Sequence, residues 1–137
     1  MKKTLMTLIA AFAIFSASAQ EANQKIIIDV TSTDNEVYQS VLLTINIMAK
    51  ENPSTQFDVI AYGKAVPMFM KDRSPVANQI TKFKENDNIK FSACEISMRL
   101  FNIKKEQLLE GVTTIPNAVE EIVKKQKLDW GYIKSGI

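Results

Sequence analysis

Residues 25–30 read Lys-Ile-Ile-Ile-Asp-Val, and this stretch decides the fold class. A continuous β-branched run of this kind is typical of a strand that is buried on both faces of a parallel sheet. The segment that follows carries apolar residues at helical spacing to about Lys50, and Thr33 and Glu36 at its start have the spacing of a capping box. A proline-containing break ends this helix, and a second strand is predicted at 57–62.

The rest of the chain continues the alternation of strands and helices. Further strands are predicted at 89–93, 112–115 and 130–133, and helical segments at 75–83, 94–102, 104–109 and 116–128. Ser92 and Glu95 repeat the capping-box spacing, which places Cys94 at the second helical position. The apolar segment Ala65–Met70 is interpreted as core, with a lining for the thiol or an oligomer contact as the alternatives. We therefore predict a three-layer α/β/α fold with a mostly parallel sheet.

The first nineteen residues have the pattern of a signal peptide. Lys2 and Lys3 form a basic region, an apolar run from Leu5 to Phe15 follows, and Ala-Ser-Ala at 17–19 is a small-residue cleavage site. The apolar run is shorter than the ~20 residues that span a bilayer. We expect residues 1–19 to be removed and residues 20–137 to form a single domain in the periplasm or outside the cell.

Charge and composition exclude several classes of protein. Of the whole chain, 46% is hydrophobic and 23% is charged, which fits a folded domain and excludes a disordered chain. The formal net charge of +2 comes from Lys2 and Lys3, so the exported part is neutral. A neutral domain lacks the electrostatic footprint for a nucleic acid or an anionic membrane, and we expect neither as a partner.

The residue inventory also limits the chemistry. The sequence contains no histidine, which excludes a Ser-His-Asp or Cys-His relay and removes the commonest zinc ligand. Residues 31–35, Thr-Ser-Thr-Asp-Asn, resemble a flavodoxin phosphate loop, but Asp34 replaces the glycine and would repel a phosphate. Thr33 or Asp34 is therefore interpreted as a helix cap. We expect neither a metal nor a cofactor.

Cys94 is the one cysteine of the chain and the candidate catalytic residue. It lies where a predicted strand meets a predicted helix, a position at which unpaired amides stabilise a thiolate, whereas a nearby Glu95 carboxylate would oppose ionisation. Free cysteine is also among the most buried residue types, so a small buried side chain is an equal alternative. Tyr62, Gly63 and Asn117 are candidate binding residues, because the strand ends that carry them converge at the same edge of the sheet.

Several ordered segments together resemble the DsrE/DsrF-like family of sulfur-relay proteins. The resemblance spans residues 25–134 and is carried by Val59–Val66, Phe91–Cys94, Leu100–Ile103, Leu108–Val112, Asn117–Ile122, Gln126 and Trp130–Ile133. It implies a five-stranded sheet of order 4-3-2-1-5 and a homotrimer or hexamer. It also implies that Cys94, at the family's cysteine position, carries sulfur as a persulfide.

Two functions follow as alternatives. The first is an exported persulfide carrier or sulfurtransferase that acts through Cys94, with a sulfur donor and an acceptor that the sequence does not name. The second is a non-catalytic oligomeric binding module that retains the fold. An accessible thiol with a lowered pKa favours the first, and a buried, inert thiol favours the second.

Overall fold

A computed structural model describes residues 23–136. The predicted signal peptide, residues 1–19, lies outside the described residues. The chain forms one five-stranded sheet of order β4-β3-β2-β1-β5. Its strands are β1 (Lys25–Val30), β2 (Gln56–Ala61), β3 (Ile89–Cys94), β4 (Val112–Ile115) and β5 (Gly131–Ser135).

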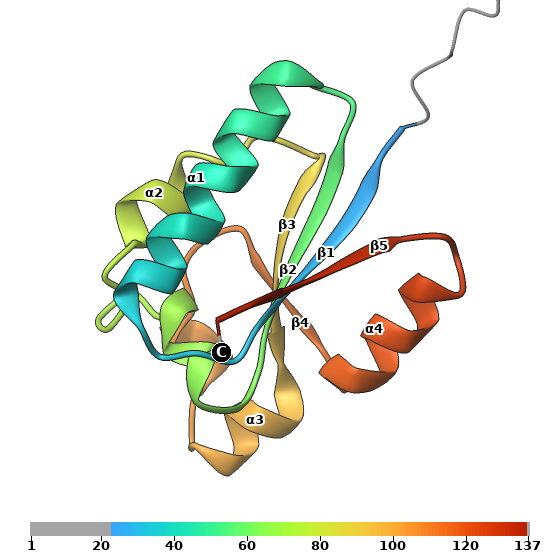
Figure 1. The fold of residues 1–137 in the computed structure, drawn as a ribbon. Helices are drawn as coiled ribbons and strands as arrows, with labels where there is room; N and C mark the ends of the chain where they lie inside the picture. The colour runs from blue at the N-terminus through green and yellow to red at the C-terminus, as the bar shows by residue number, and fades with distance from the viewer. Residues whose placement is uncertain (1–22, 137) are drawn as a thin grey trace, which may run out of the picture.

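Every pair of neighbouring strands in this sheet is parallel. Parallel strands need crossover connections, and helices supply them here. The α-helices are α1 (Asn35–Glu51), α2 (Ala77–Thr81), α3 (Glu95–Leu100) and α4 (Ala118–Gln126), and 3₁₀ turns cover Gly63–Phe69 and Lys105–Gln107. Helices α1 and α2 lie on one side of the sheet and α4 on the other (Figure 1). The predicted three-layer α/β/α class and strand order are confirmed.

The two faces of the sheet are packed differently. The α1 face carries the larger core, which includes Ile28, Phe57, Val59 and Phe91 together with Ile45 of α1. The α4 face carries a small cluster of buried side chains, made up of Ile27, Ile60, Cys94, Ala118 and Ile122. The same face also holds the buried polar side chains Asp29, Asp58 and Ser92.

The segment Ala65–Met70 belongs to the larger core. Met68 and Phe69 are completely buried, and Met70 is nearly so. The ring of Phe69 meets Phe91 of β3 edge to face at 5.7 Å between centroids. The interpretation of this segment as core is therefore confirmed. It is not available for an oligomer contact, and it packs in a different cluster from the one that contains Cys94.

Of the two residues predicted as the cap of the first helix, Asp34 is confirmed, whereas the predicted capping boxes that begin at Thr33 and at Ser92 are wrong. Asp34, not Thr33, caps α1, because its side chain accepts a hydrogen bond from the Glu36 amide at 2.8 Å. Ser92 is not a cap but a strand residue whose hydroxyl donates to Asp58 at 2.6 Å. Cys94 itself occupies the N-cap position of α3, with extended backbone angles of φ −76° and ψ 120°.

Other boundaries shift by one to a few residues. The last helix ends at Gln126 rather than at Leu128, and the last strand runs from Gly131 to Ser135. Within residues 23–136, no helix is long and apolar enough to cross a membrane.

Candidate functional site

The candidate site is built around Cys94, at the carboxyl end of β3. Strand β3 delivers the residue to the edge of the sheet, and α3 begins immediately after it. The residue is only 3% exposed, and its neighbours in the cluster are the aliphatic side chains Ile27, Ile60 and Ile122. Tyr62 and Ile115 pack against the same cluster and are only partly buried, so they form its outer side.

The starts of two helices lie close enough to Cys94 to lower the pKa of its thiol. Burial raises the pKa of the Cys94 thiol. The backbone amides of Ser97, Ala118 and Ile96 and the hydroxyl of Ser97 together lower this pKa by more than burial raises it. The net pKa of Cys94 is therefore below its ordinary value. Ile96 and Ser97 belong to the first turn of α3, whereas Ala118 is the first residue of α4. Both helix starts stabilise the thiolate.

Ser97 connects Cys94 to the end of β2. The Gly63 amide donates a hydrogen bond of 2.8 Å to the Ser97 hydroxyl oxygen. Gly63 has φ +59°, a left-handed conformation that glycine adopts without strain and that turns its amide toward α3. The predicted binding residue Gly63 thus lies beside the site and contacts Ser97 through its backbone.

Tyr62 lies between the cysteine cluster and a buried carboxylate on β1. Its hydroxyl donates to Asp29 at 3.4 Å, and Tyr132 of β5 donates to the same carboxylate oxygen at 2.5 Å. Lys134 binds the other oxygen at 3.3 Å. Burial raises the pKa of Tyr62, and the charges of Asp29 and of the Cys94 thiolate raise it further. Tyr62 is therefore a neutral phenol next to the thiol at physiological pH.

Asn117 caps α4 rather than facing the sulfur. Its side-chain oxygen accepts hydrogen bonds from the amides of Val119 at 3.0 Å and Glu120 at 3.4 Å. This cap fixes the start of the helix and so the position of the Ala118 amide that reaches Cys94. Glu95 is held by Thr114, whose hydroxyl donates to the Glu95 carboxylate at 2.9 Å.

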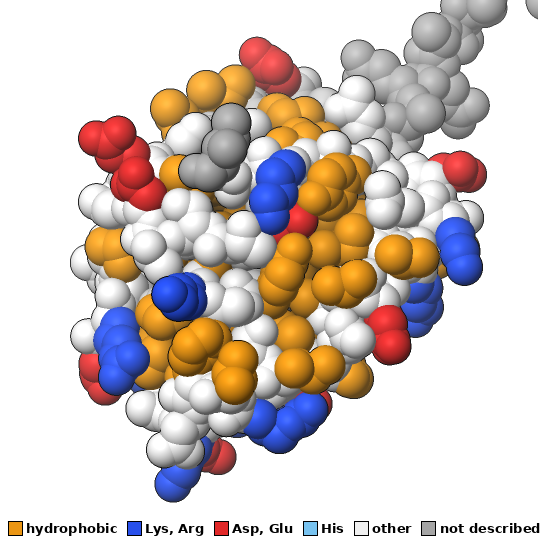
Figure 2. Space-filling model, turned by 60° about the horizontal axis from the view of Figure 1, so that its bottom comes forward, with side chains coloured by type: hydrophobic (Ala, Val, Ile, Leu, Met, Phe, Trp, Pro, Cys, Tyr) orange, Lys and Arg blue, Asp and Glu red, His pale blue; other side chains and the backbone are white. Residues whose placement is uncertain are grey.

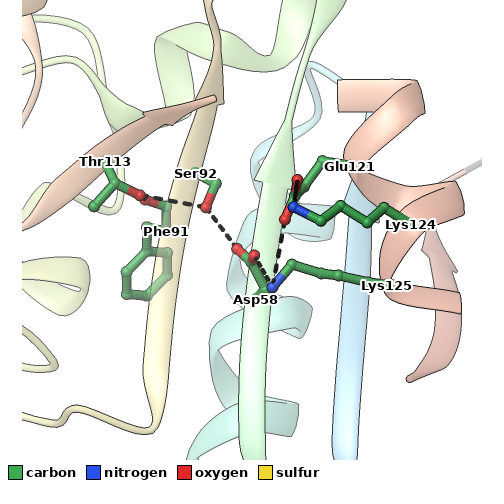
Figure 3. A network of polar contacts seen from close by, with 7 residues as sticks. All are labelled: Asp58, Phe91, Ser92, Thr113, Glu121, Lys124 and Lys125. Carbon is green, nitrogen blue, oxygen red and sulfur yellow. Dashed lines mark hydrogen bonds and ion pairs between the residues drawn. The ribbon is translucent and has the colours of Figure 1, made fainter. Parts of the chain in front are cut away.

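A buried polar network holds the rest of α4 on the sheet (Figure 3). Lys125 of α4 forms an ion pair of 2.9 Å with Asp58 of β2, and both side chains are nearly buried. Ser92 donates to the same carboxylate. The Lys125 ammonium also lies 4.0 Å from the centre of the Trp130 ring. Helix α4 is therefore anchored at its carboxyl end by a charge pair, and its amino end is placed against Cys94.

Sequence reasoning placed Cys94 correctly at a strand end but missed Ser97 and Asp29. Cys94 and Ser97 have i, i+3 spacing, which puts both side chains on the same side of the first helical turn. Asp29 is the one acid in an apolar strand, and a buried acid needs partners. Both signals, the spacing of Ser97 from Cys94 and the single acid in an apolar strand, were present in the sequence. In residues 23–136, no group of three or more Cys, Asp or Glu side chains is placed to hold a metal ion.

Comparison with known proteins decides the family. The model of the DsrE/DsrF-like family matches residues 24–134. The chain belongs to this family. A search of curated proteins found no match.

Solved structures of similar fold come from archaea and bacteria. MTH1491 of Methanobacterium thermoautotrophicum, a protein of unknown function, has a TM-score of 0.76 and 22% identity over 81% of this chain and 98% of its own. The ychN protein of E. coli has a TM-score of 0.65 and 16% identity over 81% and 98%. BT1422 of Bacteroides thetaiotaomicron, also of unknown function, has a TM-score of 0.65 and 17% identity over 84% and 97%. At these identities the DsrE-like fold is what the chains share.

Proposed function

We propose that this member of the DsrE/DsrF-like family carries sulfur as a persulfide on Cys94. The observation that carries the proposal is the place of Cys94 at the N-cap of α3 and beside the start of α4, where amides of both helices and the Ser97 hydroxyl lower the pKa of its thiol. A thiolate is the form that attacks sulfane sulfur, and a thiol of low pKa is also the better leaving group when the sulfur is passed on. The same hydrogen-bond donors to Cys94 therefore favour both the loading and the unloading of sulfur.

The atoms of the two steps balance. In loading, the Cys94 thiolate attacks the outer sulfur of a donor persulfide, the donor S–S bond breaks, and the donor leaves as a thiolate. In unloading, an acceptor thiolate attacks the outer sulfur on Cys94, and Cys94 leaves as a thiolate. No net oxidation or reduction is needed, because sulfane sulfur is only exchanged between thiols.

Burial of Cys94 supports the alternative function, a non-catalytic oligomeric binding module. A residue that is 3% exposed meets a donor only if a neighbouring side chain moves. Tyr62, Ile115 and Trp130 are the partly buried side chains that pack against the Cys94 cluster, so the carrier requires the displacement of one of them. In a binding module this movement does not occur, and the cysteine is part of the packing.

Intact-mass spectrometry separates the two functions. Residues 20–137, reduced and then exposed to inorganic polysulfide, gain the mass of one or more sulfur atoms in the carrier, and dithiothreitol removes this mass. Cys94→Ser gains none and keeps the far-ultraviolet circular dichroism of the wild type. If the wild-type protein stays unmodified under conditions that load a known persulfide carrier, the carrier function is contradicted and only the binding-module function remains.

We also propose that the protein forms a homotrimer or hexamer. Large hydrophobic side chains are exposed on α3, α4 and β5, including Ile96, Leu100, Phe101, Val119, Val123 and Ile133. Figure 2 shows hydrophobic side chains gathered on the face formed by the carboxyl ends of the strands. Exposed apolar surface of this kind is typical of interaction sites. Light scattering tests the proposal, and a monomer at micromolar concentration contradicts it.

Export is proposed from the sequence of residues 1–19 alone. Expression of the full chain in a bacterium, followed by osmotic-shock fractionation and mass determination, gives a periplasmic protein that begins at Gln20. An unprocessed chain in the cytoplasmic fraction contradicts export.

A further inference from the structure

We propose that a cavity between α1 and α2 binds a small amphiphile with one carboxylate, such as a medium-chain fatty acid. The ligand chain lies on Leu42, Leu43 and Phe83, and its carboxylate pairs with Lys82. The cavity is on the α1 side of the sheet, whereas the Cys94 cluster is on the α4 side (Figure 1). Binding there does not depend on the persulfide function.

The cavity exists because α2 covers only part of α1. Helix α1 has 17 residues, whereas α2 has 5. The two helices lie side by side (Figure 1), and the Gln79 side-chain amide donates a hydrogen bond of 2.8 Å to the Gln39 side-chain oxygen. One wall comes from α1 between Gln39 and Asn46, about 10 Å along the helix. The other wall comes from residues 79–83, and the cavity volume of about 590 Å³ is within the usual range of ligand sites.

The cavity has an apolar floor. Leu42 is 3% exposed and belongs to the larger core. Phe83 packs against the same core, and its ring centre lies 6.2 Å from that of Phe91. Leu43 also lines the cavity but is 59% exposed, so a large apolar side chain remains in contact with water. An alkyl chain laid over these three lining side chains removes apolar surface from water, which favours binding.

Lys82 determines the charge of the ligand. Of the described residues that line the cavity, Lys82 alone carries a charge, and the other polar ones, Gln39, Ser40, Asn46 and Gln79, are neutral. A carboxylate therefore meets an opposite charge in this cavity, whereas a cationic head group meets a like charge. An apolar segment of a second copy of the chain would cover the Lys82 ammonium without a counter-charge, which is unfavourable. The charge thus favours an anionic amphiphile as the occupant.

Nuclear magnetic resonance of residues 20–137, labelled with ¹⁵N, tests the site with octanoate as the probe. We expect saturable shifts of the side-chain amide signals of Gln39 and Gln79 and of the backbone amide signals of residues 39–46 and 79–83. Octyltrimethylammonium has the same chain and the opposite charge, and we expect it to bind several-fold more weakly. Butyrate, which lacks most of the chain, gives no saturation.

Two pairs of variants separate the charge from the chain contact. Lys82→Gln weakens octanoate binding several-fold, whereas Lys84→Gln leaves it unchanged, because Lys84 lies outside the lining and pairs with acidic side chains there. Leu43→Ser also weakens binding, whereas Ile47→Ser does not, because Ile47 is an exposed residue of α1 outside the lining. All four side chains are exposed, so the variants keep the far-ultraviolet circular dichroism of the wild type.

Three results would overturn the inference. The first is a set of octanoate shifts that do not saturate or that spread over the whole chain. The second is equal affinity for octanoate and octyltrimethylammonium, or equal octanoate affinity of Lys82→Gln and Lys84→Gln. The third is a cavity that binds no octanoate while its amide signals broaden with protein concentration, which would show that a second copy of the chain covers it.

Discussion

The Lys125 ammonium of α4 lies 2.9 Å from the Asp58 carboxylate of β2, and both side chains are nearly buried. Removing one partner of a buried pair leaves the other charge without compensation, at a cost of about 3–5 kcal/mol. We predict a loss of this order in the free energy of unfolding of Lys125→Met, measured by urea denaturation.

The neighbouring lysine provides the control for this substitution. Lys124 is mostly exposed, and its ion pair with Glu121 is 4.0 Å long. Exposed pairs contribute roughly 0–1 kcal/mol, so Lys124→Met changes the unfolding free energy little. Equal effects of the two substitutions would show that the Asp58–Lys125 pair does not anchor α4.

The alkaline limit of stability depends on Tyr132. Its hydrogen bond to Asp29, with burial and the Asp29 charge, raises the pKa of Tyr132 to about 12, from an ordinary value of 10.0. A raised pKa in the folded state gives a contribution to stability that is complete below the unfolded pKa and disappears as the pH rises through the folded one. The contribution of Tyr132 is therefore lost between pH 10 and about 12.

Phenolate absorbance measures this directly. Tyr38 and Tyr62 also have a raised pKa, so the folded protein shows little phenolate absorbance at pH 10, whereas the chain unfolded in urea titrates normally. Tyr132→Phe removes the component that titrates near pH 12 and flattens the loss of stability above pH 10. A folded wild type whose three tyrosines all titrate near pH 10 would contradict the Asp29 contacts.

The Ala118 amide is the donor from α4 to the Cys94 sulfur, and it can be removed without breaking the helix. Ala118 is the first helical residue after Asn117, a position where proline is favoured because its missing N–H has no partner within the helix. We predict that Ala118→Pro raises the pKa of the Cys94 thiol. A rise of one unit lowers the thiolate fraction at pH 7 by about tenfold.

Ala118→Gly is the matched variant, since it keeps the amide and places no new polar group in the buried cluster around Cys94. Its thiol titrates as in the wild type, followed by absorbance of the thiolate at 240 nm. If both variants titrate as the wild type does, α4 contributes nothing to ionisation of Cys94.

The sheet could be predicted from sequence because its signals are periodic. The β-branched run at 25–30 and the strand of 112–115 were recognisable without knowledge of their partners, and the alternation with helices implied parallel pairing. The helix caps were harder. Thr33, Asp34 and Asn35 are all compatible with a cap, and the residue at which helical backbone angles begin is decided by packing as well as by local side chains.

The site was only partly predictable for a different reason. Cys94 could be placed at a strand end from local pattern alone. The contact of Ser97 with Gly63 joins residues 34 positions apart, and that of Tyr132 with Asp29 joins residues 103 apart. Such contacts depend on strand order and register. In the sequence they appear only as a serine one turn after the cysteine and as an acid within an apolar strand.

Transfer of labelled sulfur tests the central claim most directly. Wild-type protein loaded with ³⁴S polysulfide, desalted and mixed with a small acceptor thiol is followed by intact mass. The account predicts that the ³⁴S mass leaves Cys94 and appears as one equivalent of acceptor persulfide, with the reduced protein recovered. A protein that takes up no label, or that holds the label on a residue other than Cys94, would contradict it.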